Sequence, residues 1–279
     1  MLSIKLNNGV KIPVLGLGTW QAQENEVYHA VKAALKNGYK HIDTATIYEN
    51  EAEIGQAIQD SGVERKNIFL TTKLWNSVST AKGTRKAFEE SLRLLQTDYV
   101  DLYLIHWPGS YERILEVWSE MEKLYEEGKV RAIGVSNFNV HHLDVLLRNG
   151  KIKPAVNQVE CHVKLQNAFL NEYCQQRGIY LEAYAPMMSW KVGELLEDET
   201  LQAIAGKHNK QVTQVALRYL IQRNIVVLPK SVKEERIIQN AALFDFELSA
   251  EEMKQIRLLN GGTRLFPEPD NADFGFMEA

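Results

Sequence analysis

Eight short apolar runs recur along the chain, and segments with helical periodicity separate them. In these segments apolar residues recur at spacings of three and four, as at Val27, Ala30 and Ala34. Strands that alternate with helices favour a parallel sheet, and eight such units are the number that closes a barrel. We therefore expect one domain over residues 1–279, an α/β fold of the (β/α)₈ TIM-barrel type. The apolar runs comprise residues 14–18, 41–44, 68–73, 100–106, 132–135, 155–159, 180–185 and 225–228.

Additional elements are expected at both ends of the barrel. Near the N-terminus, apolar and polar residues alternate around Asn8-Gly9, a pair typical of a two-residue β-hairpin turn. Such an N-terminal hairpin predicts a lid over one end of the fold. After the last apolar run, residues 234–242 and 250–259 have helical patterns, which indicates an extra C-terminal helix. Residues 261–267 lack periodicity and are expected to form a surface flap.

An open doubly wound sheet is the alternative fold that this alternation leaves open. A sheet of that kind that binds a dinucleotide has three spaced glycines after its first strand. Gly16 and Gly18 supply two of them, but Gln21 stands where the third would be. The barrel is therefore the preferred interpretation.

Composition narrows the range of functions. The chain has 32 Lys and Arg against 36 Asp and Glu, a net charge of −4, and no basic run, which argues against a nucleic-acid surface. No apolar run approaches the length that spans a membrane, and the N-terminus lacks the basic-then-apolar pattern of a signal peptide. Cys161 and Cys174 are too few for a disulfide framework, so we expect reduced cysteines in a cytoplasmic protein.

Polar side chains at the ends of successive predicted strands indicate a catalytic site. In a (β/α)₈ barrel all strands end at one face, where active sites lie. Asp43 ends the second run, and Tyr48 follows it by five residues. Lys73 and His106 end the third and fourth runs. A phenol has a pKa of about 10 and needs a cation beside it to donate a proton near neutral pH. Lys73 can be that cation, with Asp43 as its counter-ion.

The other strand ends also have polar or aromatic residues. Any one strand-end residue has an ordinary structural explanation when it is taken alone. Asp43 could be a helix cap, Lys73 a solvated strand end and His106 a core histidine. Their joint presence at one barrel mouth favours a functional site. The further strand-end residues are Trp20, Trp75, Trp107, Ser136, Asn137, Gln158, Tyr184, Lys230 and Ser231.

Five motifs, which are given at the end of this paragraph in chain order, resemble the signatures of the aldo-keto reductase superfamily. The resemblance covers nearly the whole chain, and the length and short loops are similar to those of small prokaryotic members, which include diketogluconate and methylglyoxal reductases. It implies NADPH-dependent reduction of aldehydes and ketones to alcohols by hydride transfer, on a barrel that binds NADP(H) without a Rossmann fold. The motifs are HIDTA at 41–45, TKLW at 72–75, LIHWP at 104–108, GVSNF at 134–138 and LPKS at 228–231.

The resemblance implies a catalytic role for each of four residues. Tyr48 would be the general acid that protonates the carbonyl oxygen. Lys73, paired with Asp43, would lower the pKa of the phenol, because a nearby cation stabilises the phenolate. His106 would donate a hydrogen bond to the same oxygen and orient the carbonyl.

The resemblance also implies which residues bind the cofactor and the substrate. Two positions differ from the common family pattern: Gln239 stands where many relatives have a glutamate against the adenine, and Ala185 replaces a serine. The implied cofactor residues are Ser136, Asn137 and Gln158 at the carboxamide, Tyr184 against the nicotinamide ring, Lys230, Ser231 and Arg236 at the 2′-phosphate, and Asn240 at the adenine. The residues implied to line an apolar substrate pocket are Trp20, Trp75 and Trp107.

Two other functions remain as alternatives. A metal-dependent hydrolase would need clustered ligands at the strand ends, where only Asp43 and His106 qualify, so we expect no metal. His141-His142 begins a predicted helix and is expected to be a solvated pair. The second alternative is a regulatory barrel that binds the cofactor without significant turnover. As partners we expect a small carbonyl substrate, no nucleic acid and no membrane, with the protein a monomer.

Overall fold

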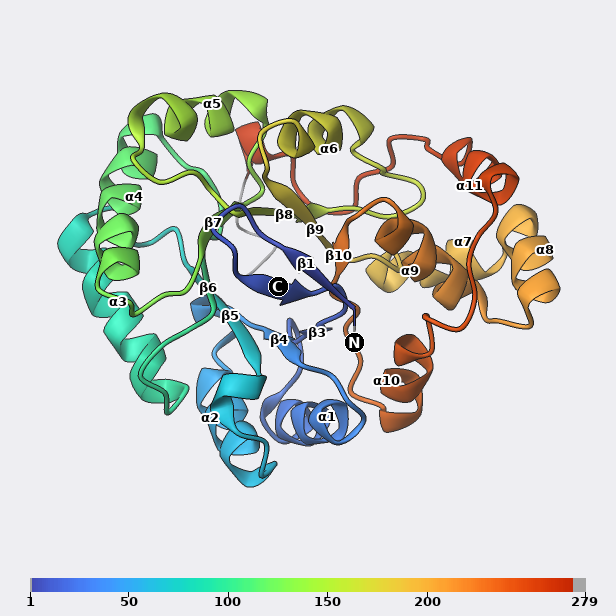
Figure 1. Cartoon of the computed structure of the whole chain (residues 1–279), viewed down its shortest axis with the longest axis horizontal. Coiled ribbons are helices and arrows are strands. Elements are labelled where there is room, and N and C mark those ends of the chain that lie inside the picture. Colours follow the sequence, from blue (N-terminus) through green and yellow to red (C-terminus); the bar gives the residue numbers. More distant parts are fainter. Residues whose placement is uncertain (1, 273–279) are drawn as a thin grey trace.

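Eight parallel strands form the centre of the molecule (Figure 1), and the computed structural model describes residues 2–272. The strands follow one another around the sheet in chain order. Parallel bridges from Leu15 to Val227 and from Gly18 to Lys230 join the first strand to the last. The expected (β/α)₈ barrel is confirmed. The strands are β3 (Leu17–Gly18), β4 (His41–Asp43), β5 (Phe69–Leu74), β6 (Leu102–Ile105), β7 (Ile133–Ser136), β8 (Val156–Glu160), β9 (Tyr180–Tyr184) and β10 (Val226–Val227).

The two glycines near the first strand let the barrel close. The Gly16 amide donates a hydrogen bond to the Val227 carbonyl at 2.9 Å. A Cβ atom at Gly16 would lie 2.7 Å from the Leu228 side chain and 2.8 Å from the His41 ring, too close for any side chain. Gly16 and Gly18 therefore permit close packing of β3 against β10, instead of forming a dinucleotide-binding turn.

A ring of helices surrounds the barrel (Figure 1). Two helices are inserted between β9 and α9, and α11 is the expected extra C-terminal helix. Apolar stripes hold the ring in place; on α4, for example, Ile114, Trp118 and Met121 are buried against the core cluster. The helices are α1 (Glu24–Lys36), α2 (Glu51–Asp60), α3 (Ala81–Leu94), α4 (Tyr111–Glu126), α5 (Val140–Asn149), α6 (Ala168–Gln175), α7 (Val192–Leu196), α8 (Glu199–His208), α9 (Val212–Gln222), α10 (Glu234–Ala241) and α11 (Ala250–Arg257).

An N-terminal hairpin of β1 (Ser3–Lys5) and β2 (Lys11–Pro13) crosses the end of the barrel at which the strands begin (Figure 1). Its Leu6 and Ile12 side chains complete an apolar cluster with the first residues of the barrel strands, so the predicted lid is confirmed. The turn has three residues, not two: the Leu6 amide bonds to the Val10 carbonyl, and Gly9 takes the left-handed conformation with φ +89°.

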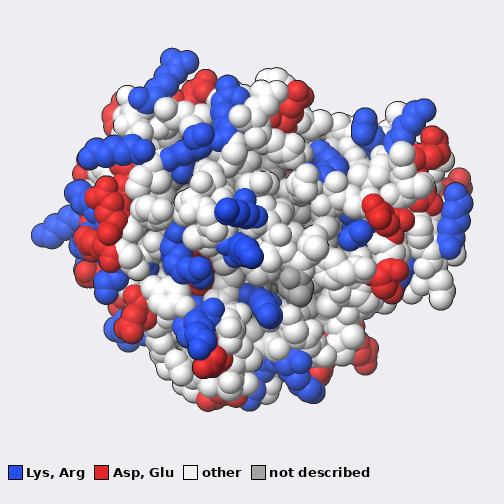
Figure 2. Space-filling view, viewed as in Figure 1, with Lys and Arg blue, Asp and Glu red and all other residues white. Residues whose placement is uncertain are grey.

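The hairpin end has a distinct charge distribution. Figure 2, in the same view, shows lysine and arginine side chains over this face and acidic side chains mainly toward its rim. Lys5 and Lys11 on the hairpin are both exposed. Charges of the two signs are therefore unevenly distributed over this face.

Some expectations on the extent of the domain reach beyond the described residues. The expected domain of 1–279 includes residue 1 and residues 273–279, which lie outside them. Within residues 2–272, every helix is too short or too polar to cross a membrane. Cys161 and Cys174 are buried free thiols.

Candidate active site

Asp43, Tyr48, Lys73 and His106 meet where β4, β5 and β6 end, as the sequence predicts. Lys73 is fully buried, and its Nζ lies 2.6 Å from Asp43 Oδ1 and 2.8 Å from the Thr44 carbonyl oxygen. The same Nζ lies 3.5 Å from Tyr48 Oη. One ammonium group therefore joins a buried carboxylate to the phenol.

The loop after β4 holds Tyr48 in place. Tyr48 ends a single 3₁₀ turn, η1 (Thr46–Tyr48), just before α2. The Thr44 hydroxyl donates to Asn50 Oδ1 at 2.7 Å, and Asn50 Nδ2 donates to the Thr19 carbonyl at 3.0 Å. The Thr46 hydroxyl donates to the carbonyl of Lys73 at 3.1 Å. These bonds link the loop to the neighbouring strand ends, so the position of the phenol is fixed by the barrel itself.

The charges in the site determine the protonation state of Tyr48. Burial disfavours the charged form of Lys73, but Asp43 and Tyr48 outweigh it, and the pKa of the ammonium is raised. Burial raises the pKa of Tyr48 above its usual value, and the Lys73 charge opposes that rise. Lys73 thus lowers the pKa of Tyr48, as expected, but desolvation raises this pKa by more. The phenol keeps its proton at neutral pH, which a general acid requires.

His106 is a neutral imidazole. Burial lowers its pKa well below the usual value, and the charges of Lys73 and Arg113 add to this effect. Its Nδ1 has no hydrogen-bond partner among residues 2–272. The ring packs edge-on against Tyr48, with centroids 5.7 Å apart, and against Trp75 at 5.1 Å. A neutral ring can donate a single N–H to a carbonyl oxygen without adding charge.

A cavity of about 590 Å³ opens at this face. Asp43, Tyr48 and His106 line it, and Lys73 lies behind them. Trp20 and Trp107 also line it, whereas Trp75 packs against His106 and is absent from the described lining. All the implied cofactor residues line the same cavity: Ser136, Asn137, Gln158, Tyr184, Lys230, Ser231, Arg236 and Asn240.

Asn137, Gln158 and Tyr184, which the resemblance implies bind the cofactor, are held by hydrogen bonds near Asp43 and His106. Asn137 takes the left-handed conformation with φ +62°, and its Nδ2 donates to the His106 carbonyl at 3.0 Å. Its Oδ1 accepts a bond of 2.8 Å from the Tyr184 hydroxyl. Gln158 Nε2 donates to Asp43 Oδ2 at 2.8 Å, which leaves the amide oxygen on the opposite side. An aromatic face and an amide acceptor are thus presented to the cavity, and both suit a nicotinamide with its carboxamide.

The C-terminal tail lies over the cavity, which corrects the expectation of a surface flap. The amides of Leu265 and Phe266 donate to the buried carboxylate of Glu160 at 2.7 and 3.1 Å. Phe266 is buried, and its ring packs against Tyr184 at 5.1 Å and Trp20 at 5.3 Å. Phe266 lines the cavity. It was not predicted from the sequence as a site residue. The available signal was a Leu-Phe pair in an otherwise polar tail.

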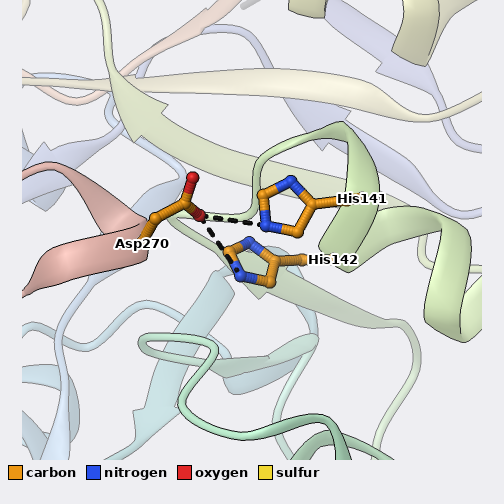
Figure 3. A group of neighbouring side chains, drawn as sticks. All are labelled: His141, His142 and Asp270. Atoms are coloured by element: carbon orange, nitrogen blue, oxygen red, sulfur yellow. Dashed lines mark ion pairs between the residues drawn. The ribbon is translucent and has the colours of Figure 1, made fainter.

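The tail is also attached to the start of α5. His141 Nε2 lies 3.0 Å and His142 Nε2 3.4 Å from Asp270 Oδ1, as Figure 3 shows. Asn139 Nδ2 donates to the same oxygen at 3.1 Å and to Glu268 at 2.9 Å. His142 is buried, so the expectation of a solvated histidine pair is wrong for this residue.

The hydrogen bonds of His142 bear on whether this group could bind a metal. The ligand atoms of His141, His142 and Asp270 lie within 4.8 Å of one another. However, His142 Nδ1 accepts the Asn139 amide in the cap of α5, at 3.2 Å. The proton of a neutral imidazole must then be on Nε2, the atom that faces Asp270. This arrangement suits a histidine that donates to a carboxylate.

Known proteins share both the sequence and the fold of this chain. A model described as the Aldo/keto reductase family matches residues 14–260. The chain is 52% identical over 273 residues to the glyoxal reductase of Bacillus subtilis, with 98% of each chain covered. It is 48% identical over 277 residues to a 9,11-endoperoxide prostaglandin H2 reductase of Trypanosoma cruzi, covering 99% of this chain and 98% of that one. A crystal structure of an aldo-keto reductase enzyme from a Medee basin deep-sea metagenome library matches with a TM-score of 0.96 at 56% identity, covering 97% of this chain and 100% of that one.

Proposed function

The chain belongs to the aldo/keto reductase family, and on this premise we propose that it reduces aldehydes and ketones to alcohols with NADPH. The observation that carries the proposal is the position of one buried ammonium. Lys73 Nζ lies 2.6 Å from Asp43 Oδ1 and 3.5 Å from Tyr48 Oη, and Asp43 and Tyr48 line the cavity. A phenol beside a buried cation is a proton donor whose conjugate base is stabilised.

The catalytic residues would supply the proton and orient the carbonyl. A bound nicotinamide supplies the hydride to the carbonyl carbon. Tyr48 transfers its proton to the carbonyl oxygen, and the ammonium of Lys73 stabilises the phenolate until solvent returns a proton. Neutral His106 donates a hydrogen bond to the same oxygen, so the carbonyl is polarised and held in one orientation.

The residues proposed to bind NADPH line the same cavity as Asp43, Tyr48 and His106. Two cationic side chains among them, Lys230 and Arg236, are exposed, and a phosphate dianion suits them. Gln239 lines the same cavity. The proposed contacts are Ser136, Asn137 and Gln158 to the carboxamide, Tyr184 to the ring face, Lys230, Ser231 and Arg236 to the 2′-phosphate, and Asn240 to the adenine.

Arg236→Ala tests the preference for NADPH over NADH. Loss of a hydrogen bond to a charged group typically costs about 1.5–3 kcal/mol, so NADPH affinity should fall roughly tenfold or more. NADH, which has no 2′-phosphate, should bind nearly as before. Cofactor titrations followed by protein fluorescence measure both. Equal affinity of the unmutated protein for the two cofactors would refute the preference.

We propose small 2-oxoaldehydes as substrates, because the 52% identical relative is a glyoxal reductase. The cavity that Tyr48 lines is also lined by Trp20, Trp107 and Phe266, which favours compact, uncharged compounds. The test is loss of NADPH absorbance on addition of glyoxal, methylglyoxal, simple aldehydes or sugar ketones. Steady turnover with one of these classes supports the reductase. NADPH binding without turnover across the panel would favour the regulatory barrel instead.

A further inference from the structure

A carboxyl group, Glu182, lies inside the barrel beneath the proposed site. Side chains two residues apart along a strand lie on the same face, so Glu182 shares the inner face of β9 with Tyr184 and lies one layer deeper. The strand register places it beside Gln158 of β8. The Glu182 side chain is 0% exposed, so bulk solvent does not reach it.

The two carboxyl oxygens of Glu182 have different surroundings. Oε2 accepts a hydrogen bond of 3.1 Å from Gln158 Nε2. Oε1 accepts none from residues 2–272 and faces His41 Nε2 at 3.8 Å. That ring nitrogen is itself 3.0 Å from the Thr71 hydroxyl. Among the ion pairs of the described residues, Glu182 has none with a lysine or arginine.

These surroundings favour the neutral acid. Burial, followed by the charge of Asp43, raises the pKa of Glu182 to about 8. Burial also lowers the pKa of His41 to about 3, so its ring brings no positive charge. Lys73, the remaining titratable group that faces Glu182, is bound to Asp43 at 2.6 Å. At neutral pH the side chain of Glu182 is therefore a carboxylic acid.

Glu182 and Asp43 together set the orientation of the Gln158 amide. An amide nitrogen has two hydrogens, and here both point into the barrel, to Asp43 Oδ2 at 2.8 Å and to Glu182 Oε2 at 3.1 Å. The amide oxygen must then point the other way, into the cavity that Gln158 lines. Rotation of the amide by 180° would place its oxygen against the negatively charged Asp43 carboxylate and would remove the bond that Glu182 Oε2 accepts.

We propose that Glu182 is a positioning residue for carbonyl reduction. As a protonated acid it holds Gln158 with its amide oxygen toward the nicotinamide carboxamide, and it keeps a second negative charge away from the Asp43–Lys73 pair. This inference rests on the proposed function, because the role of Gln158 in cofactor binding comes from it.

The proposal has a consequence for the pH dependence of the reaction. Above pH 8, ionised Glu182 competes with Asp43 and Tyr48 for the charge of Lys73. The phenolate of Tyr48 is then less stabilised, so proton transfer to the substrate slows. The activity should therefore fall as Glu182 loses its proton.

Two substitutions of Glu182 and one control separate this role from a merely structural one. Glu182→Gln keeps an acceptor for Gln158 and cannot ionise, whereas Glu182→Leu removes the acceptor. The control is Glu51→Gln. Glu51 is another buried acid with a raised pKa. Its hydrogen bonds go to the hydroxyls of Thr72 and Ser91 instead of Gln158, and Lys73 is the weakest of the influences on its pKa.

The kinetic readout is kcat/KM against pH with NADPH and methylglyoxal. The unmutated protein and Glu51→Gln should both lose activity as the pH rises through about 8, while Glu182→Gln should lack this inflection. Glu182→Leu should bind NADPH at least roughly tenfold more weakly, and Glu182→Gln should restore most of that affinity. An inflection retained in Glu182→Gln, or unchanged NADPH affinity in Glu182→Leu, would overturn the proposal.

A readout that needs neither cofactor nor turnover is thermal unfolding of the cofactor-free protein. The folded pKa of Glu182 lies above its ordinary 4.5, so its contribution to stability is present at low pH and is lost as the pH rises toward 8. The unmutated protein should lose stability relative to Glu182→Gln over this interval, and parallel melting curves would contradict a buried proton. If the unmutated protein reduces no carbonyl, the proposed function fails, while the NADPH titrations and melts still test Glu182.

Discussion

The Asp43–Lys73 pair has two effects, one on stability and one on the proposed chemistry, and substitutions of these residues can separate them. The Lys73 side chain is 0% exposed and that of Asp43 5%, so water cannot solvate either charge if its partner is removed. Asp43 neutralises the ammonium inside the barrel, and the ammonium in turn stabilises negative charge on Tyr48. The first effect contributes to stability, and the second to the proposed chemistry.

Lys73→Met should abolish reduction and also destabilise the protein. Leaving a buried partner unpaired typically costs ~3–5 kcal/mol, because the remaining carboxylate has lost its counter-ion. The double change Asp43→Asn with Lys73→Met should restore much of the stability and none of the activity. Thermal melts and kcat on the three proteins measure both effects. Equal melting temperatures for the single and double variants would show that the two residues are not an interdependent buried pair.

The sequence indicated most of the site residues but missed Glu182 and Phe266. Asp43, Lys73 and His106 stand out because each is a polar residue at the end of an apolar run. Glu182 stands in the middle of such a run, and its neighbours become known only when the strand register is fixed. A period-two reading from Tyr184 would have placed it inside the barrel.

At the scale of elements, the C-terminal tail completes the cavity that the strand ends begin. Asp270 attaches the tail to the start of α5, and Glu160 at the end of β8 binds two of its amides. Phe266, whose amide is one of these two, lies within 5.3 Å, centroid to centroid, of the rings of Tyr184, Trp20 and Trp190. The tail thereby contributes an aromatic wall beside the proposed position of the substrate.

Phe266→Ala should raise the KM for the carbonyl substrate roughly tenfold and change kcat less. The reason is that this ring contributes apolar contact area, a loss of about 1–2 kcal/mol, and no group to the proton transfer. The matched control is Phe169→Ala on α6, whose side chain is 74% exposed. Steady-state kinetics with methylglyoxal compare the two. The same KM in both variants would remove the tail from the substrate pocket.

The regular elements could be predicted from the sequence more fully than the irregular ones. Apolar runs and period-3.6 patterns both come from burial, and they identified the barrel strands and the helix α11. The turn of the hairpin depends instead on the left-handed conformation of Gly9, which lengthens it to three residues. The path of residues 261–267 depends on contacts with Glu160, more than 100 positions earlier in the chain, and no local pattern records them.

At the scale of the whole molecule, the two ends of the barrel differ: one is closed by apolar packing, and the other contains the proposed site. The hairpin and its apolar cluster seal the end where the strands begin, and the proposed site occupies the end where they finish. Residues as far apart in sequence as Asp43 and Asn240 line one cavity because all eight strands end at that face. The layer that contains Glu182 connects the two ends through buried polar groups.

Tyr48→Phe, measured by single-turnover NADPH oxidation with methylglyoxal, tests the central claim most directly. This change removes one oxygen atom and leaves the ring, so NADPH titrations should give nearly the same affinity as the unmutated protein. The account predicts that the chemical step is lost, because the phenol supplies the proton for the carbonyl oxygen. A variant that keeps more than about a tenth of the rate has lost less than ~1.4 kcal/mol of transition-state stabilisation, and that result would contradict the role of Tyr48 as the general acid.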